Sequence, residues 1–280
     1  MRVLLFAIVL SGCLPWGDAQ DWADAPAGVT SWEWILSVED LPPAPASVDL
    51  FGMDGLDVAP EYVNVVAATG ASPWCYLSVG TAEEYREDYS AFVALDEAER
   101  AAGNEGVLGG VLPDWPDERW LNLRRADVLL PLMEARLSIC EDKGFTLVEF
   151  DNMDGYSNDT GLDLTDQEAR AWIASLIASA ADRGLGVIHK NASELVTDLQ
   201  PSMDALLLES CVLDDFCEEA ALPFLDAGKP VMNAEYPEAW SDQGRRFVLD
   251  DVCARSEQAG VSTLIKTLDL DARSIVCAAR

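Results

Sequence analysis

The stretch Gly144–Tyr156, GFTLVEFDNMDGY, decides how the rest of the chain is interpreted. Its segment Phe145–Phe150 is mostly apolar, which is typical of a strand that is covered on both faces of a sheet. Asp151, Asn152 and Asp154 follow this strand immediately. Carboxylates are costly to desolvate, and in a parallel α/β barrel the C-terminal ends of the strands hold the active site. A functional site competes here with a polar loop whose Asp and Asn side chains form turns and cap the next helix.

The composition of the chain restricts its class and its partners. The 280 residues are half hydrophobic, which is enough for a sizeable core. The net charge is -32, from 50 acidic and 18 basic residues, and this disfavours binding to nucleic-acid phosphates. A cationic or neutral partner fits better, because a negative cleft concentrates positive ligands. The alternative explanation of the charge is a soluble or salt-adapted surface.

The N-terminus has the pattern of an export signal. Arg2 precedes the unbroken apolar run Val3–Leu10, which is too short to span a bilayer as a mature helix. The following Leu-Ser-Gly-Cys, which ends at Cys13, resembles the lipobox of bacterial lipoproteins. This pattern predicts that Cys13 is lipidated and that the protein is held at the cell envelope by the lipid alone. The alternative is an ordinary secretory peptide that is cleaved near Ala19.

The chain therefore divides into three parts. We expect a lipoprotein signal peptide at residues 1–13, a flexible tether rich in Ala, Asp, Pro and Gly at residues 14–29, and one folded domain at residues 30–280. No other stretch is long and apolar enough to cross a membrane. We expect a monomer.

Six cysteines remain when Cys13 is set aside, and an even number in an exported chain suggests disulfides. Six cysteines allow 15 pairings, which the sequence alone does not resolve. Spacing favours Cys211 with Cys217 and Cys253 with Cys277, which leaves Cys75 with Cys140. No metal or other cofactor is expected, since the chain has no CxxC pair and a single histidine, His189, which is expected to be packed in the core.

Eight strand-like segments alternate for the most part with helical ones. The expected strands are 31–37, 48–51, 74–79, 145–150, 186–190, 205–209, 230–235 and 261–266. The expected helices are 59–69, 125–143, 165–183, 214–227 and 245–258. This number of strands in about 250 residues predicts a single-domain (β/α)8 TIM barrel. A doubly wound sheet is the main competitor, but no Gly-rich phosphate loop follows the first strand.

One part of the chain does not follow this alternation. Residues 83–123 contain short helical pieces and a stretch rich in Gly and Trp. We interpret them as a long excursion from the third strand-to-helix loop that helps to shape a cleft.

Polar side chains end several of the expected strands. Asp151, Lys190, Glu209 and Glu235 would share one face of the barrel. Four further residues would lie beside them: Trp34, Tyr76, Asp154 and Asn191. Facing carboxylates in an aromatic-walled cleft suit glycoside hydrolysis, and Asp151 and Glu209 are the strongest pair.

Some of these residues have a structural alternative. Lys190 could simply pair with a carboxylate in the barrel mouth. Glu235 could hold Lys190 or Tyr236 in place instead of contacting substrate. Trp34 and Tyr76 could belong to the core.

An ordered set of motifs resembles one enzyme family. The set comprises SWEWIL at 31–36, YLSVGTAEEYR at 76–86, GFTLVEFDNMDGY at 144–156, HKN at 189–191, LESC at 208–211 and EY at 235–236. Together they resemble glycoside hydrolase family 114, the endo-α-1,4-polygalactosaminidases. The similar segments extend from residue 32 to residue 236.

The resemblance implies a (β/α)8 barrel that cleaves α-1,4-linked galactosamine polymers with retention. It implies Asp151 as the nucleophile and Glu209 as the general acid/base. A cationic or partly acetylated galactosamine polysaccharide would be the partner, which would also account for the acidic chain. Substrate contacts are then expected from Trp34, Tyr76, Asp154, Lys190, Asn191, Glu235 and Tyr236. The segment around Glu209 departs from the family pattern by having fewer acids, which affects the expected subsite contacts.

Two other functions are compatible with these residues. One is a polysaccharide-binding lipoprotein that keeps the barrel without the chemistry. The other is a Ca²⁺ site in the loop of residues 151–163, although the spacing of the acidic residues in this loop does not fit an EF-hand.

Overall fold

The computed structural model describes residues 31–277. The expected signal peptide at 1–13 with Cys13, and the expected tether at 14–29, lie outside these residues.

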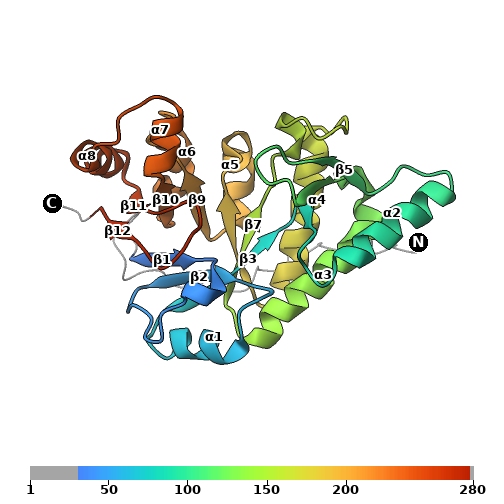
Figure 1. The fold of residues 1–280 in the computed structure, drawn as a ribbon, viewed down its shortest axis with the longest axis horizontal. Helices are drawn as coiled ribbons and strands as arrows, with labels where there is room; N and C mark the ends of the chain where they lie inside the picture. Colours follow the sequence, from blue (N-terminus) through green and yellow to red (C-terminus); the bar gives the residue numbers. More distant parts are fainter. Residues whose placement is uncertain (1–30, 278–280) are drawn as a thin grey trace, which may run out of the picture.

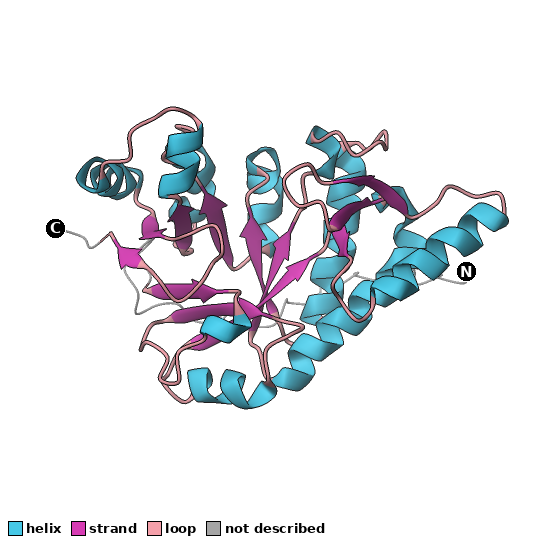
Figure 2. Cartoon of the chain, viewed as in Figure 1, coloured by secondary structure: helices cyan, strands magenta, loops and turns pink. Residues whose placement is uncertain are grey.

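Eight parallel strands follow one another in chain order and curl into a (β/α)8 barrel, with helices on the outside (Figures 1 and 2). These strands are β1 (Trp32–Ile35), β2 (Leu50–Asp54), β3 (Ser72–Ser78), β7 (Leu147–Asp151), β8 (Gly186–Lys190), β9 (Ala205–Glu209), β10 (Val231–Glu235) and β11 (Ser262–Ile265). A ninth strand, β12 (Ile275–Val276), pairs antiparallel with β11. The predicted fold class is confirmed.

The stretch Gly144–Tyr156 contains β7, which lies at the centre of this sheet. β7 pairs in parallel with β3 on one side and with β8 on the other. Leu147, Val148 and Phe150 are buried, as expected of a strand that is covered on both faces. The register places Asp151 opposite Ser78, at the end of both strands.

The seam between β1 and β11 is held by side chains, since no backbone ladder joins these two strands among the described residues. The Trp32 indole Nε1 donates a hydrogen bond to the Ser262 carbonyl at 3.1 Å. The buried Lys266 ammonium pairs with Glu33 at 3.0 Å. These contacts bring the first and last parallel strands together.

The helices are α1 (Pro60–Ala67), α2 (Tyr89–Ala101), α3 (Ala126–Lys143), α4 (Asp166–Ala181), α5 (Val196–Leu199), α6 (Cys217–Asp226), α7 (Pro237–Asp242) and α8 (Leu249–Ala259). Thr165 and Glu168 form the expected capping box at the start of α4. Two helices begin later than predicted, because loops occupy the residues before α6 and before α8. The short helices α5 and α7 were not predicted.

The excursion after β3 forms a second sheet. Its strands are β4 (Thr81–Glu83), β6 (Glu118–Leu121) and β5 (Leu108–Val111), paired antiparallel in that order. α2 and β5 reach outward on one side of the barrel (Figure 1, right). Buried ion pairs attach this sheet to the barrel: Arg136 of α3 pairs with Glu83 at 2.9 Å, and Arg86 pairs with Asp54 of β2.

Three disulfides connect Cys75 with Cys140, Cys211 with Cys217, and Cys253 with Cys277. This is the pairing that spacing favoured. None of the helices within residues 31–277 is long and apolar enough to cross a membrane. The same residues contain no cluster of three or more His, Cys, Asp or Glu side chains that could hold a metal ion.

Candidate active site

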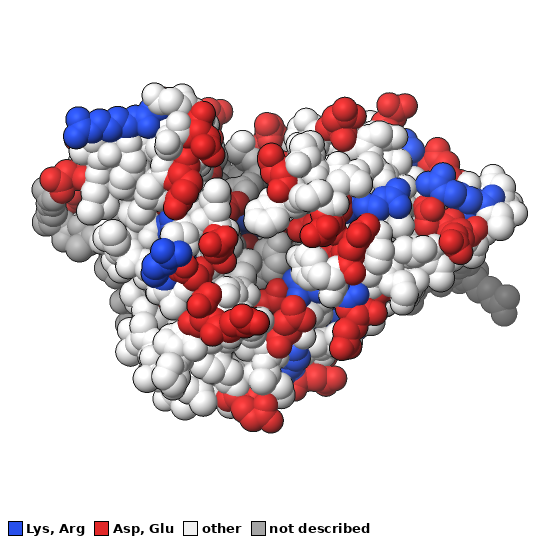
Figure 3. Space-filling model, in the orientation of Figure 1, with Lys and Arg blue, Asp and Glu red and all other residues white. Residues whose placement is uncertain are grey.

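A cavity of about 660 Å³ opens where the parallel strands end. Figure 3 shows this face of the molecule hollowed in the middle, with Asp and Glu side chains around the hollow. The end of β7 contributes Asp151, the end of β8 contributes Lys190, and the end of β9 contributes Glu209. These three residues were expected to share one face of the barrel, and Lys190 contacts both carboxylates.

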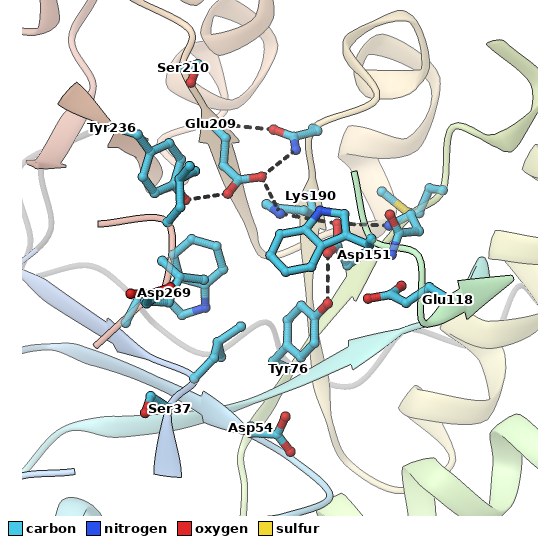
Figure 4. A pocket seen from close by; sticks show the side chains of 18 of the residues that line it. Ser37, Asp54, Tyr76, Glu118, Asp151, Lys190, Glu209, Ser210, Tyr236 and Asp269 are labelled. Carbon is cyan, nitrogen blue, oxygen red and sulfur yellow. Dashed lines mark hydrogen bonds and ion pairs between the residues drawn. The ribbon is translucent and has the colours of Figure 1, made fainter. Parts of the chain in front are cut away.

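Lys190 lies between the two carboxylates (Figure 4). Its Nζ is 3.2 Å from Asp151 Oδ1 and 2.7 Å from Glu209 Oε2. It also lies 5.2 Å from the centre of the Trp34 ring, a distance at which a cation is attracted to the aromatic face. Lys190 is only 3% exposed, and a buried charge is costly unless it is paired. The two carboxylates provide that pairing.

Each of the two carboxylates accepts a hydrogen bond from a different tyrosine. The Tyr76 hydroxyl donates to Asp151 Oδ2 at 3.0 Å, and the Tyr236 hydroxyl donates to Glu209 Oε1. Asn191 fixes Glu209 twice: its Nδ2 donates to Glu209 Oε2 at 3.0 Å, and its Oδ1 accepts from the Glu209 backbone N–H at 2.8 Å. Both carboxylates are therefore oriented before any substrate arrives.

The charges in the cavity shift the pKa values of its members. Burial acts to raise the pKa of Glu209, but Lys190 and the hydrogen bonds from Tyr236 and Asn191 outweigh it and leave the pKa below its usual range. Burial acts to lower the pKa of Lys190, and Asp151 and Glu209 reverse this and raise it. Burial, followed by the charge of Asp151, raises the pKa of Asp154.

A third carboxyl group, Glu149, lies beneath this pair. It is fully buried, and its Oε2 accepts a hydrogen bond from Trp74 Nε1 at 2.8 Å. Its Oε1 has no hydrogen-bond partner among the described residues and lies 3.9 Å from Lys190 Nζ. Burial raises the pKa of Glu149 to about 8, against the lowering effect of Lys190. Glu149 lies inside the apolar run 145–150, and its position in the sequence did not predict a place near the site.

Of the seven residues expected to contact substrate, six line the cavity: Trp34, Tyr76, Asp154, Lys190, Asn191 and Tyr236. Trp34 is only 1% exposed and forms part of the cavity floor beneath Lys190.

Glu235 is the seventh, and the structure does not bring it to the cavity. It is fully buried, and its carboxylate accepts hydrogen bonds from Trp240, Asn233 and the backbone N–H of Val212. Its role is to brace the loop that follows Glu209. The expected partners, Lys190 and Tyr236, are not the groups it holds.

His189 is packed in the core, as expected. It is fully buried, and its Nε2 lies 2.8 Å from the carbonyl oxygen of Asn191. Burial lowers its pKa to about 4, so the ring is neutral at physiological pH.

The excursion helps to shape the cavity, as its sequence predicted, and the segment between β11 and β12 forms another wall that was not predicted. Tyr85, Trp115 and Glu118 line it from the excursion, and Leu268 and Asp269 line it from the other segment. Tyr85 falls in the motif at 76–86, but neither it nor the other four residues ends a strand of the barrel, which is the position that pointed to Asp151 and Glu209.

The sequence as a whole matches a known enzyme family. The sequence profile of glycoside-hydrolase family GH114 matches residues 14–280. The chain belongs to glycoside-hydrolase family GH114. The family that the ordered motifs resembled is thereby confirmed, and the protein is a glycoside hydrolase.

Solved structures agree with this assignment. This GH114 chain is similar to Aspergillus fumigatus Ega3 in complex with galactosamine, with 29% identity, a TM-score of 0.78, and coverage of 90% of this chain and 96% of that one. It also shares the fold of the glycoside hydrolase domain of PelA from Pseudomonas aeruginosa, with 17% identity, a TM-score of 0.60, and coverage of 90% and 98%. No curated protein sequence matches it.

Proposed function

We propose that this glycoside hydrolase cleaves α-1,4-galactosaminidic bonds in an amino-sugar polysaccharide by a retaining mechanism. Asp151 is the nucleophile and Glu209 is the general acid/base. The observation that carries the proposal is the placement of both carboxylates on the single ammonium of Lys190.

This placement supports retention over inversion. Asp151 Oδ1 and Glu209 Oε2 lie 3.2 Å and 2.7 Å from the same nitrogen, so they are no more than about 6 Å apart. Retaining glycosidases have carboxyl groups about 5–5.5 Å apart, whereas inverting enzymes need about 6.5–9.5 Å to admit a water molecule. The limit of about 6 Å between these two oxygens lies below the range of inverting enzymes and supports retention.

The reaction takes two steps. Asp151 attacks the anomeric carbon while the protonated form of Glu209 gives its proton to the departing glycosidic oxygen. A glycosyl ester to Asp151 forms, and the bond between the anomeric carbon and the glycosidic oxygen breaks. Glu209 then removes a proton from water, which attacks the same carbon and releases Asp151. Tyr76 and Tyr236 keep the two carboxylates in position through their hydrogen bonds.

The substrate class rests on charge and on the similar structure. A polymer of galactosamine carries ammonium groups, and the cavity presents carboxylates that are not neutralised by Arg86 at Glu118, Asp151, Asp154, Glu209 and Asp269. The Ega3 structure, at 29% identity, holds galactosamine. Both observations favour a cationic or partly acetylated galactosamine polymer.

The test is incubation of the protein with α-1,4-galactosamine oligomers, followed by mass spectrometry and proton NMR of the products. We expect shortened oligomers whose new reducing end first appears as the α anomer. Asp151→Asn and Glu209→Gln should each reduce kcat at least about a thousandfold. Asp57→Asn is the matched control, because this cavity carboxylate is already paired with Arg86 at 2.9 Å. Full activity in both catalytic variants would refute the assignment. Binding without turnover would favour a polysaccharide-binding protein.

We further propose that the protein is exported and attached to the cell envelope through lipidated Cys13. Three disulfides support an oxidising compartment. In a bacterial host, the protein should incorporate labelled palmitate and partition into a detergent phase, and Cys13→Ala should abolish both. If Cys13→Ala changes neither property, the anchor assignment is wrong and the ordinary secretory signal is favoured.

A further inference from the structure

Glu118 is a cavity residue that the proposed mechanism does not use. It begins β6, in the excursion, and is only 6% exposed. Its Oε2 accepts a hydrogen bond from Thr81 Oγ1 at 2.7 Å, while no described residue donates a hydrogen bond to Oε1. Figure 4 shows the carboxyl group pointing into the cavity toward Asp151 and Tyr76.

No Lys or Arg within residues 31–277 forms an ion pair with Glu118. The nearby guanidinium of Arg86 is held by Asp54, Asp57 and Glu83. Burial raises the pKa of Glu118 to about 7, with Glu83 and Asp151 acting in the same direction and Thr81 and Arg86 opposing it. A carboxylate that is buried without a counter-ion is costly, and a cationic ligand in the cavity would remove that cost.

The same wall of the cavity carries two exposed aromatic side chains. Trp115 is 57% exposed and Tyr85 is 59% exposed, and both line the cavity with Glu118. The Arg86 guanidinium lies 4.9 Å from the centre of the Tyr85 ring, and the Tyr85 hydroxyl donates to Glu83. The exposed apolar surface of both aromatic side chains suits the faces of sugar rings. A wall with an aromatic surface and an unpaired carboxyl group matches a ring that bears an ammonium group.

We propose that Glu118 is a specificity-determining residue that binds the ammonium group of an amino-sugar unit. The excursion forms this subsite beside Asp151, and the side chains of Trp115 and Tyr85 provide its apolar surface. The proposal deepens the proposed function and rests on it for the class of substrate. The subsite favours the de-acetylated sugar, because an acetamido group carries no charge for Glu118 to neutralise.

The test measures binding separately from cleavage. Calorimetry is performed in the Asp151→Asn background, so that no substrate is consumed, with α-1,4-galactosamine oligomers and with their N-acetylated counterparts. Glu118→Gln keeps the shape and hydrogen-bonding capacity of the side chain but removes its charge. We expect the Kd for galactosamine oligomers to rise about tenfold or more, and the Kd for acetylated oligomers to change less than about twofold.

The control variant is Asp57→Asn, which removes a carboxylate of the same cavity that is already neutralised by Arg86. It should leave both Kd values within about twofold. An equal loss for both oligomers in Glu118→Gln would show that Glu118 acts through shape or hydrogen bonding, and would overturn the assignment. No change in either Kd, or no binding of galactosamine oligomers to any version, would also overturn it. Charge-dependent binding without hydrolysis by the Asp151-containing protein would retain Glu118 and refute the proposed catalysis.

Discussion

At the residue scale, the site depends on one ammonium group that serves several carboxylates. Lys190 contacts Asp151 and Glu209 directly and lies near Glu149. It offsets the cost of burying this negative charge, and it also makes Glu209 a weaker base and a stronger acid than an isolated glutamate. The position of Lys190 at the end of an apolar run, directly before Asn191, predicts that it lies at a strand end. It does not predict that two carboxylates share the Lys190 ammonium group.

Lys190→Met should therefore change the pH dependence of activity. Burial raises the pKa of Glu209 and Lys190 lowers it, so loss of Lys190 raises it. The acid form of Glu209 then persists to higher pH, and the basic limb of the kcat/KM profile should move upward by about one pH unit or more, at a reduced maximum. The measurement is kcat/KM from pH 4 to 9. Lys229→Met is the control for loss of a lysine, because Lys229 bonds the carbonyl oxygens of Gln200 and Met203 before β9, at the opposite end of that strand from Glu209. An unmoved basic limb would show that Glu209 does not set it.

Glu149→Gln should change stability in a pH-dependent way. The pKa of Glu149 is raised to about 8 in the folded protein, chiefly by burial, and is about 4.3 in an unfolded chain. Between these values the folded state holds a proton that the unfolded state lacks, so the free energy of unfolding falls as pH rises. The variant lacks this pH dependence. Between pH 5 and pH 8, its free energy of unfolding should rise by on the order of 3 kcal/mol relative to that of the unsubstituted protein. Urea denaturation at both pH values measures it, and parallel pH dependences would contradict the raised pKa.

At the element scale, the barrel could be predicted and the excursion could not. The strands β8 and β9 begin and end at the predicted residues, because their apolar runs finish at a single polar side chain. By contrast, β5 has the sequence LGGV, whose two glycines show no alternation of apolar and polar residues, so no strand was predicted there. Glu118 starts a strand instead of ending one, so the reasoning that found Asp151 and Glu209 did not reach it. Glu235 ends a strand as they do, yet Trp240 of the unpredicted α7 draws its carboxylate away from the cavity.

The disulfides tie elements together over very different lengths of chain. Cys211 and Cys217 are 6 residues apart, Cys253 and Cys277 are 24 apart, and Cys75 and Cys140 are 65 apart. In the chain-entropy account, replacing each pair by alanine should cost about 2, 3.5 and 4 kcal/mol, in that order.

Chemical denaturation of the three double variants measures this order. Only the variant without Cys211 and Cys217 should also lose kcat, because that disulfide closes the loop directly after Glu209. Equal kcat in all three variants would show that the loop holds Glu209 without the disulfide.

At the scale of the whole molecule, the net charge of -32 and the acidic hollow act in the same direction on a cationic polymer. The barrel places carboxylates from distant parts of the chain around one opening, so their fields add and attract ammonium groups before contact. Raising NaCl from 0.1 M to 1 M shortens the screening length from about 10 Å to about 3 Å. The KM for galactosamine oligomers should then rise at least about threefold, while kcat changes little, because the groups around Asp151 are shielded from solvent. Acetylated oligomers are the control, since they carry no charge to be attracted. If salt raises both KM values equally, the acidic surface serves solubility, and the attraction of substrate depends on the cavity alone.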